Sequence, residues 1–164
     1  MPLFAAYTYL KTANLNALLL TSTLEGEAKH VGHMLAAVAR EVHVSSDPVS
    51  KPAGIVVGGE TTVTVIGNGL GERNQELALA AAKIASLNCV ALAAISTDGV
   101  DGPADAADAV VDGNTIRRAM KFGLDAGEFL VKNDSYNFFL KLDDLIFTGS
   151  TGTNVNDICV LIVL

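Results

Sequence analysis

The sequence predicts an α/β protein, a layered mixed β-sheet flanked by helices in a single domain. Short apolar runs rich in Val, Ile and Leu alternate with longer segments whose apolar residues recur every three or four positions. Half of the 164 residues are hydrophobic and only 18% are charged, which is typical of a folded chain with a sizeable core. Alternating strands and helices imply a sheet with helices packed on it.

The expected strands are short apolar or β-branched runs bounded by glycine, proline or polar residues. Within residues 54–67, Gly58, Gly59 and Glu60 separate two such runs, which predicts a hairpin or a sharp turn between neighbouring strands. A hairpin here would make the sheet mixed. The expected strands are 17–22, 54–57, 62–66, 89–95, 145–147 and 158–164.

The expected helices follow the 3.6-residue period. Ser22 and Glu25 have the spacing of a capping box, so a helix is expected from there to about Val42, with its apolar stripe toward the sheet. Residues 1–17 show no clear pattern and remain an unassigned N-terminal segment, which leaves 18–164 as the α/β domain. The other expected helices are 74–86, 115–122 and two short ones within 125–142.

Composition excludes several classes of function. Eleven basic and eighteen acidic residues give a formal charge of -7, so neither nucleic acid nor an anionic membrane surface is an expected partner. Cys89 and Cys159 lie in apolar runs and are expected to be reduced. The N-terminus has no basic region before its apolar residues, so a cytoplasmic location is expected.

Four polar loops lie where strand ends are expected to meet at one edge of the sheet. Ligands of α/β proteins usually bind at such an edge, so these loops are the candidate site. They are residues 58–61, 67–75, 96–105 and 148–157.

The second of these loops suggests an anion site. Gly67, Gly69 and Gly71 precede a helix, and glycine amides together with a helix N-terminus attract phosphate. Arg73 stands at the start of that helix, where a cation is unfavourable to the helix dipole. It is therefore a candidate functional residue. The alternative is a surface arginine paired with a carboxylate.

The third loop is rich in aspartate. Asp98 and Asp101 follow a buried strand, and their carboxylates could hold a hard cation such as Mg²⁺. The alternative is a series of Asp-Gly turns in which the carboxylates cap backbone amides. Asp98, which is nearest the strand end, is the stronger candidate.

Two further groups are weaker candidates. Hydroxyls and bare amides between 148 and 157 suit a carboxylate or phosphate, although the segment could equally be a plain connector. Glu27, His30 and His33 have a spacing that could bind metal, but histidines on the polar face of a helix are usually solvated.

Taken together, five segments resemble the C-terminal part of the glycerate 2-kinases, the part that contains the MOFRL domain. The family is also known under the name hydroxypyruvate reductase. The resemblance covers about residues 18–163, in the family's order. Glu72, Asp108 and Ser150 depart from the family's pattern. The segments are TSTLEGEA (21–28), GGETTVTVIGNGLGERNQELAL (58–79), STDGVDGPADAADA (96–109), NDSYNFF (133–139) and TGSTGTNVND (148–157).

This resemblance implies that the γ-phosphoryl group of ATP is transferred, with Mg²⁺, to the 2-hydroxyl of D-glycerate or a related hydroxy acid. Arg73 and Asp98 would be catalytic, and Asp98 and Asp101 would hold the metal. Gly67, Gly69 and Gly71 would bind phosphate. Substrate binding would fall to Glu60, Asn74, Asp101, Thr151, Thr153 and Asn154.

Family members also carry an N-terminal domain with a catalytic lysine, which the 164 residues are not expected to include. The chain is therefore expected to be inactive in isolation, with the missing domain as its partner. The alternative is a stand-alone, non-catalytic module that binds a small anion or forms a homo-oligomer.

Overall fold

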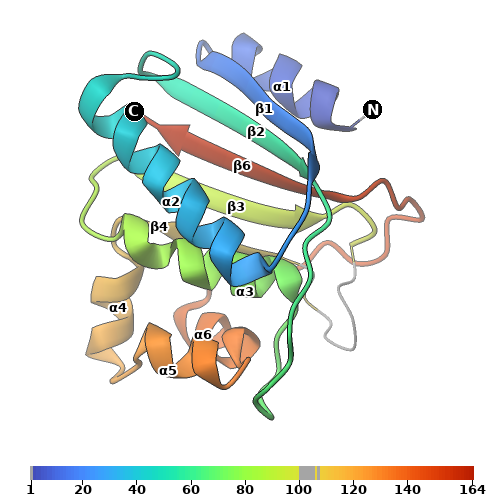
Figure 1. Cartoon of the computed structure of the whole chain (residues 1–164), viewed down its shortest axis with the longest axis vertical. Coiled ribbons are helices and arrows are strands. Elements are labelled where there is room, and N and C mark those ends of the chain that lie inside the picture. Colours follow the sequence, from blue (N-terminus) through green and yellow to red (C-terminus); the bar gives the residue numbers. More distant parts are fainter. Residues whose placement is uncertain (1, 100–105, 107) are drawn as a thin grey trace.

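A computed structural model describes residues 2–99, 106 and 108–164. In this part of the chain six strands form one sheet in the order β1-β2-β6-β3-β4-β5 (Figure 1). β1 and β2 are parallel, and the other neighbouring strands are antiparallel. The strands are β1 (Asn16–Leu24), β2 (Ala53–Gly59), β3 (Val90–Ser96), β4 (Asp108–Asp112), β5 (Leu145–Ile146) and β6 (Asp157–Val163).

Helices cover both faces of this sheet. α2 and α3 lie on one face and α1 lies on the other, while α4, α5 and α6 gather at the end near β4 (Figure 1). The helices are α1 (Pro2–Thr12), α2 (Ala28–Ser45), α3 (Arg73–Ala81), α4 (Thr115–Lys121), α5 (Ala126–Val131) and α6 (Ser135–Leu142), and a 3₁₀ turn, η1 (Ala82–Ile84), extends α3.

Two hydrophobic cores, one on each face of the sheet, explain why apolar and polar residues do not alternate along β2. Ile55 and Val57 pack into the main core beneath α2 and α3, whereas Val56 packs with Leu3 and Leu10 of α1 on the opposite face. All seven residues of β2 are buried, as expected for a strand covered on both sides. The strands that border the site are therefore anchored by hydrophobic burial on both faces.

The fold class is as predicted, a single mixed α/β sheet flanked by helices, and most elements lie where the sequence places them. The predicted helices at 74–86, 115–122 and within 125–142 correspond to α3 with η1, α4, and α5 with α6. None of the helices in the described ranges combines the length and the hydropathy needed to cross a bilayer.

Four local predictions differ from the structure. The first seventeen residues include the helix α1, which sequence pattern did not reveal. The capping box is wrong, because Ser22 lies inside β1 and α2 begins only at Ala28. The hairpin is also wrong. Residues 62–66 form no strand, and Thr62 makes only an isolated parallel bridge with Glu27.

The fourth difference is β4, which falls within residues 97–113, where the sequence predicts a loop. Its Asp108 and Asp112 resemble turn residues in the sequence. However, Ala109 and Val111 between them are buried in the main core. Pairing with β3 along one side supplies the hydrogen bonds that make this short strand stable.

Helix α2 packs unusually closely on α3 at Gly32. A Cβ placed on Gly32 would overlap the Leu77 carbonyl oxygen and would lie 2.8 Å from Ala80 Cβ. We therefore expect Gly32→Ala to destabilise the protein by about 1 to 3 kcal/mol, although alanine is the better helix former. Urea unfolding measures the change. Arg40→Ala on the exposed face of α2 is the control and should change stability by less than about 0.5 kcal/mol.

Candidate functional site

The ends of three strands meet at one edge of the sheet. Asp157, the first residue of β6, is paired on one side with Gly59, the last residue of β2, and on the other with Ser96, the last residue of β3. The carboxyl ends of β2 and β3 and the amino end of β6 are therefore level. The loops that adjoin these ends carry most of the residues predicted from the sequence.

Arg73 is held at this edge by two carboxylates. Its Nε donates to Asp157 Oδ2 at 2.7 Å and its Nη2 donates to Asp157 Oδ1 at 3.3 Å, while Nη1 donates to Glu60 Oε1 at 2.7 Å. The Asp157 side chain is 7% exposed and that of Glu60 is 55% exposed. Arg73 therefore has one buried anchor and one partner that faces solvent.

This pairing agrees with the alternative interpretation of Arg73, an arginine paired with carboxylates. The same pairing also gives Arg73 a fixed orientation. A bidentate contact with a buried aspartate fixes the plane of the guanidinium. The pair also compensates for a cation at the start of α3, where the helix dipole is unfavourable to it. A fixed cation at the edge of a groove can serve as an anion-binding group.

Asp98 lies at the same edge, two residues after Ser96, which is paired with Asp157. Its Oδ1 accepts from Ser96 Oγ at 2.6 Å and its Oδ2 accepts from Asn154 Nδ2 at 3.3 Å. The Asp98 carbonyl also accepts from the Thr151 amide at 2.9 Å. These contacts join the loop after β3 to the loop before β6.

The same two loops are joined by hydroxyl groups. Thr151 Oγ1 donates to the Thr97 carbonyl at 2.6 Å, and Thr97 Oγ1 donates to the Asn156 carbonyl at 2.7 Å. Thr151 Oγ1 also accepts from the Thr153 amide at 3.2 Å. These bonds attach segment 148–157 to the loop that carries Asp98.

A further carboxyl, that of Asp108, lies beneath this edge. Asp108 is fully buried, and its Oδ1 accepts from the Ser96 amide. Its Oδ2 has no hydrogen-bond partner among the described residues. Burial raises the pKa of Asp108 to about 6, and the charges of Asp157 and Asp98 act in the same direction.

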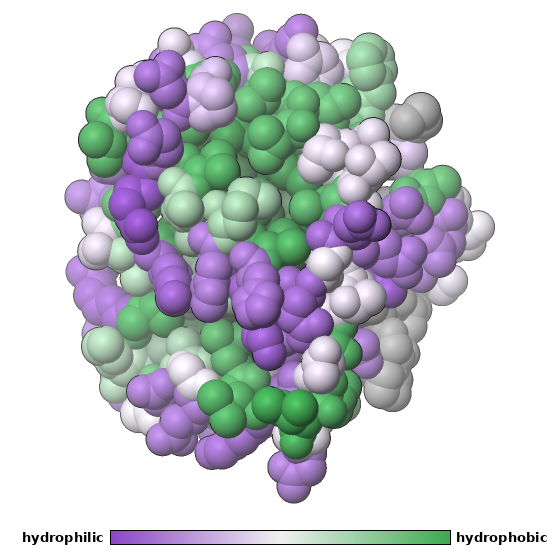
Figure 2. Space-filling model, viewed as in Figure 1, coloured by the Kyte–Doolittle hydropathy of each residue, from purple (hydrophilic) through white to green (hydrophobic). Residues whose placement is uncertain are grey.

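An open groove of about 600 Å³ runs beside Arg73. The groove is lined by both ends of the segment that joins β2 to α3. The lining residues are Glu60, Thr61, Thr62, Val63 and Val65 after β2, and Gly71, Glu72 and Arg73 at the start of α3. Figure 2 shows apolar side chains at the lower end of the molecule, where this segment projects. Burial raises the pKa of Glu72 above its ordinary value, and the charge of Arg73 acts in the opposite direction.

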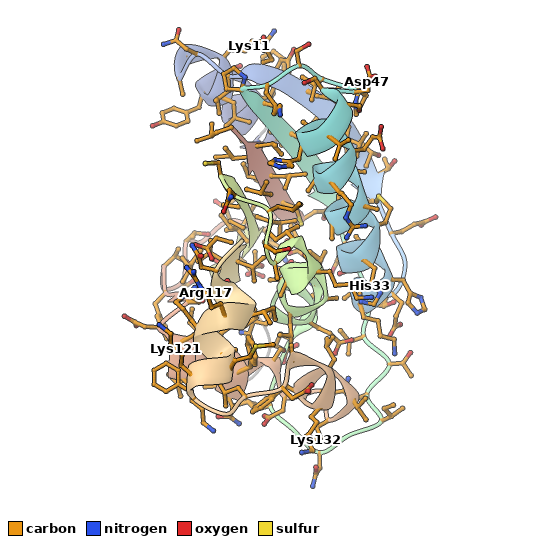
Figure 3. All side chains as sticks on the ribbon, turned by 90° about the vertical axis from the view of Figure 1, so that its left-hand side faces the viewer. Lys11, His33, Asp47, Arg117, Lys121 and Lys132 are labelled. Carbon is orange, nitrogen blue, oxygen red and sulfur yellow. The ribbon has the colours of Figure 1, made fainter. Side chains whose placement is uncertain are left out.

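Gly67, Gly69 and Gly71, here called the glycine row, do not form the phosphate-binding loop that their spacing suggests. The amide of Gly67 donates to Asn133 Oδ1 at 2.8 Å, and that of Gly69 donates to the Lys132 carbonyl at 2.9 Å. Figure 3 places Lys132 at the opposite end of the molecule from Lys11 and Asp47. Only Gly71 of the three lines the groove.

The structure thus brings Arg73, Glu60, Asp98, Thr151 and Asn154 to one edge, with Thr153 beside them. Asn74 is 1% exposed and lies under this edge, not on it. Asp101 lies outside the described residues. Sequence reasoning missed the role of Asp157, although a carboxylate at the start of an apolar strand is a recognisable signal.

Glu27 has a structural role in place of the metal role considered for it. Its carboxylate accepts from the Thr64 amide at 2.8 Å and from Thr64 Oγ1 at 3.1 Å. No group of three or more potential metal ligands occurs among the residues that the structure describes. Carboxylate oxygens suit a hard cation such as Mg²⁺, and at this edge Asp108 Oδ2 is buried without a hydrogen-bond partner in the described ranges.

Comparisons with known proteins agree on one family. The MOFRL family profile matches residues 53–157. The chain is 45% identical to the D-glycerate 2-kinase of Thermotoga maritima over 151 residues, which are 92% of this chain and 36% of that protein. It is 44% identical to the glycerate 2-kinase of Pyrococcus horikoshii, over 90% of this chain and 34% of that relative.

Solved structures show the same relationship. The crystal structure of glycerate kinase from Thermotoga maritima superposes with a TM-score of 0.97 at 42% identity, over 99% of this chain and 39% of that one. A protein of Pyrococcus horikoshii matches with a TM-score of 0.91 at 42% identity, over 96% of this chain and 36% of that one. The chain therefore spans little more than a third of these relatives.

The buried carboxyl of Asp108 predicts a pH-dependent stability. Its pKa is about 6 in the folded protein and 3.8 as an ordinary carboxyl, so the unfolded state ionises first as the pH rises. Stability is therefore lost between about pH 4 and pH 6, by up to about 3 kcal/mol for two pKa units. Asp108→Asn should abolish this loss and be more stable than the parent at pH 7.5.

Urea unfolding at pH 4 and pH 7.5 tests the expectation. Asp47→Asn, at an exposed carboxyl, is the control and should leave the pH dependence unchanged. Equal stability of the parent and Asp108→Asn at pH 7.5 would show that the buried carboxylate is not strained.

Proposed function

This chain belongs to the MOFRL family, and from this premise we propose that it acts as the C-terminal part of a glycerate 2-kinase. The observation that carries the proposal is Arg73, a cation held by a buried aspartate at the edge of an open groove. Transfer of a phosphoryl group requires fixed positive charge where negative charge develops. The proposed reaction moves the γ-phosphoryl group of ATP to the 2-hydroxyl of D-glycerate.

Arg73 is proposed as the principal catalytic residue in this chain. Asp157 fixes one side of its guanidinium, and the more exposed Glu60 occupies the other. In the complex, the carboxylate of D-glycerate or the transferring phosphoryl group would take the place of Glu60 at Nη1. Glu60 would then be free to accept a hydrogen bond from a substrate hydroxyl.

Asp98 is proposed to orient the reacting hydroxyl and to take up its proton. Contacts from Ser96 and Asn154 fix its two oxygens, as a positioned base requires. Thr151, Thr153 and Asn154 would supply further hydrogen bonds to substrate from the opposite loop. Gly71, which lines the groove, is the glycine proposed to lie nearest the phosphate, whereas the amides of Gly67 and Gly69 are bonded to Asn133 and Lys132.

Mg²⁺ and ATP belong to the proposal as partners of this edge. Asp98, with Asp101, would hold the ion, and carboxylate oxygens suit a hard cation. When bound, Mg²⁺ would neutralise charge on the phosphate groups. Most of the ATP site is proposed to lie in the N-terminal domain of the longer relatives. A cytoplasmic location, where ATP is available, is part of the proposal.

A chimera tests the proposal directly. The matching third of the Thermotoga maritima D-glycerate 2-kinase would be replaced by this chain, and D-glycerate-dependent ADP release would be measured with Mg-ATP. We expect activity in the chimera and none in this chain alone. A folded chimera without activity would contradict the proposal, and so would phosphorylation by the chain alone.

Arg73→Ala in the active chimera should lower kcat by a factor on the order of 10² or more, because a charge-stabilising donor is lost. Its effect on KM shows whether Arg73 also binds the ground state. Arg117→Ala removes an exposed arginine that contacts Asn114 and should leave kcat unchanged. Near-parental turnover of Arg73→Ala would remove Arg73 from the mechanism.

A further inference from the structure

The glycine row packs against the turn between α5 and α6, residues 132–134, and against the first residue of α6, Ser135. Leu70 donates its amide to Asp134 Oδ1 at 2.9 Å, and its carbonyl accepts from the Tyr136 amide at 2.9 Å. A Cβ on Gly67 would overlap the Lys132 carbonyl, and one on Gly71 would overlap Ser135 Oγ. The glycines therefore permit close contact between two segments of the chain.

Asn133 lies at the centre of this contact and is 4% exposed. Its Oδ1 accepts from the amides of Ile66 at 2.9 Å and Gly67 at 2.8 Å, and its Nδ2 donates to Glu76 Oε2 at 2.9 Å. Its φ of +51° is a left-handed conformation that asparagine tolerates better than most residues. One side chain thus binds both the loop before α3 and α3 itself.

Glu76 lies one turn after Arg73 on α3 and is 2% exposed. Residues three apart face the same side of a helix, so a bond to Glu76 restrains the rotation of the helix that carries Arg73. Ile66 and Gly67 begin the loop that leads into the same helix. Asn133 therefore restrains the start of α3 from both directions.

We propose that Asn133 is a positioning residue, which joins the glycine row to Glu76 and so sets the orientation of Arg73 toward Asp157. Its role in phosphoryl transfer rests on the proposed function, but its effect on Arg73 does not. The amide of Asn133 is buried and bonded at both ends, so it acts through other groups and does not itself contact substrate.

The first test uses this chain and needs no activity. Asn133→Gly removes the side chain and keeps a backbone that tolerates positive φ. We expect hydrogen exchange at the Ile66 and Gly67 amides to accelerate at least about tenfold, since each loses its acceptor. The Arg73 Nε–Hε NMR signal, assigned with Arg73→Lys, should shift or broaden as its bond to Asp157 loosens.

Thr115→Ala is the matched control for stability. Thr115 is also buried, and its Oγ1 accepts from the Asp112 amide at 2.9 Å, so its loss also leaves a buried amide unpaired. It lies at the start of α4 and has no part in the glycine row. A similar change of the Arg73 signal in Thr115→Ala would show a general effect of stability and would overturn the proposal.

An exchange of donor and acceptor provides the sharper test. Asn133→Asp alone sets two carboxylates against each other, and the pair should repel. Asn133→Asp combined with Glu76→Gln restores one carboxylate and one amide. The new carboxylate at position 133 would accept from the loop amides, and the new amide at position 76 would donate to that carboxylate. We expect the Arg73 signal to be lost in the single variant and restored in the double variant.

The same variants in the active chimera separate this inference from the proposed function. We expect Asn133→Gly to lower kcat by about 10- to 100-fold with a smaller change in KM, because a misplaced catalytic group costs turnover. The double variant should recover kcat. An unchanged Arg73 signal in Asn133→Gly overturns the positioning role. An inactive parent chimera contradicts only the kinase proposal, since the NMR result is independent of it.

Discussion

The ion pair between Arg73 and Asp157 is the interaction on which the arrangement of the site depends. It joins the start of α3 to the start of β6, residues that are 84 positions apart. Asp157 is also paired with Gly59 and Ser96 across the sheet. A single carboxylate therefore sets the position of the arginine relative to the ends of three strands.

This arrangement carries an electrostatic cost that the surrounding structure offsets. Arg73 stands at the unfavourable end of a helix dipole, and Asp98, Asp108 and Asp157 concentrate negative charge beneath one edge. Two carboxylates compensate for Arg73, and burial raises the pKa of Asp108. Sites that must bind charged substrates often retain such strain because a preorganised charge is useful there.

Rigid contacts around the edge maintain this preorganisation. Hydroxyl and amide bonds join the loop after β3 to the loop before β6, while Asn133 joins the glycine row to α3. Behind them, hydrophobic burial on both faces of β2 anchors the strand ends. The groove beside Arg73 remains open, and the relatives that match this chain extend far beyond the part it covers.

The sequence by itself determined the fold class, most strands and helices, and the candidate residues Arg73 and Asp98, because these follow from local periodicity and residue chemistry. It did not determine β4 or the true start of α2. Partners across the sheet and on other elements stabilise these features, and such partners are invisible to a local pattern. It also misled on the glycine row, whose spacing suggests an anion loop.

Only the tertiary structure decided which groups are paired. The bonds of Arg73 with Asp157, and of Asn133 with Glu76 57 positions away, join segments that no local pattern relates. Packing of α3 between the sheet and the α5–α6 turn brings these segments together. Hydrogen bonds and ion pairs depend on distances of a few ångströms, and only the folded chain sets those distances.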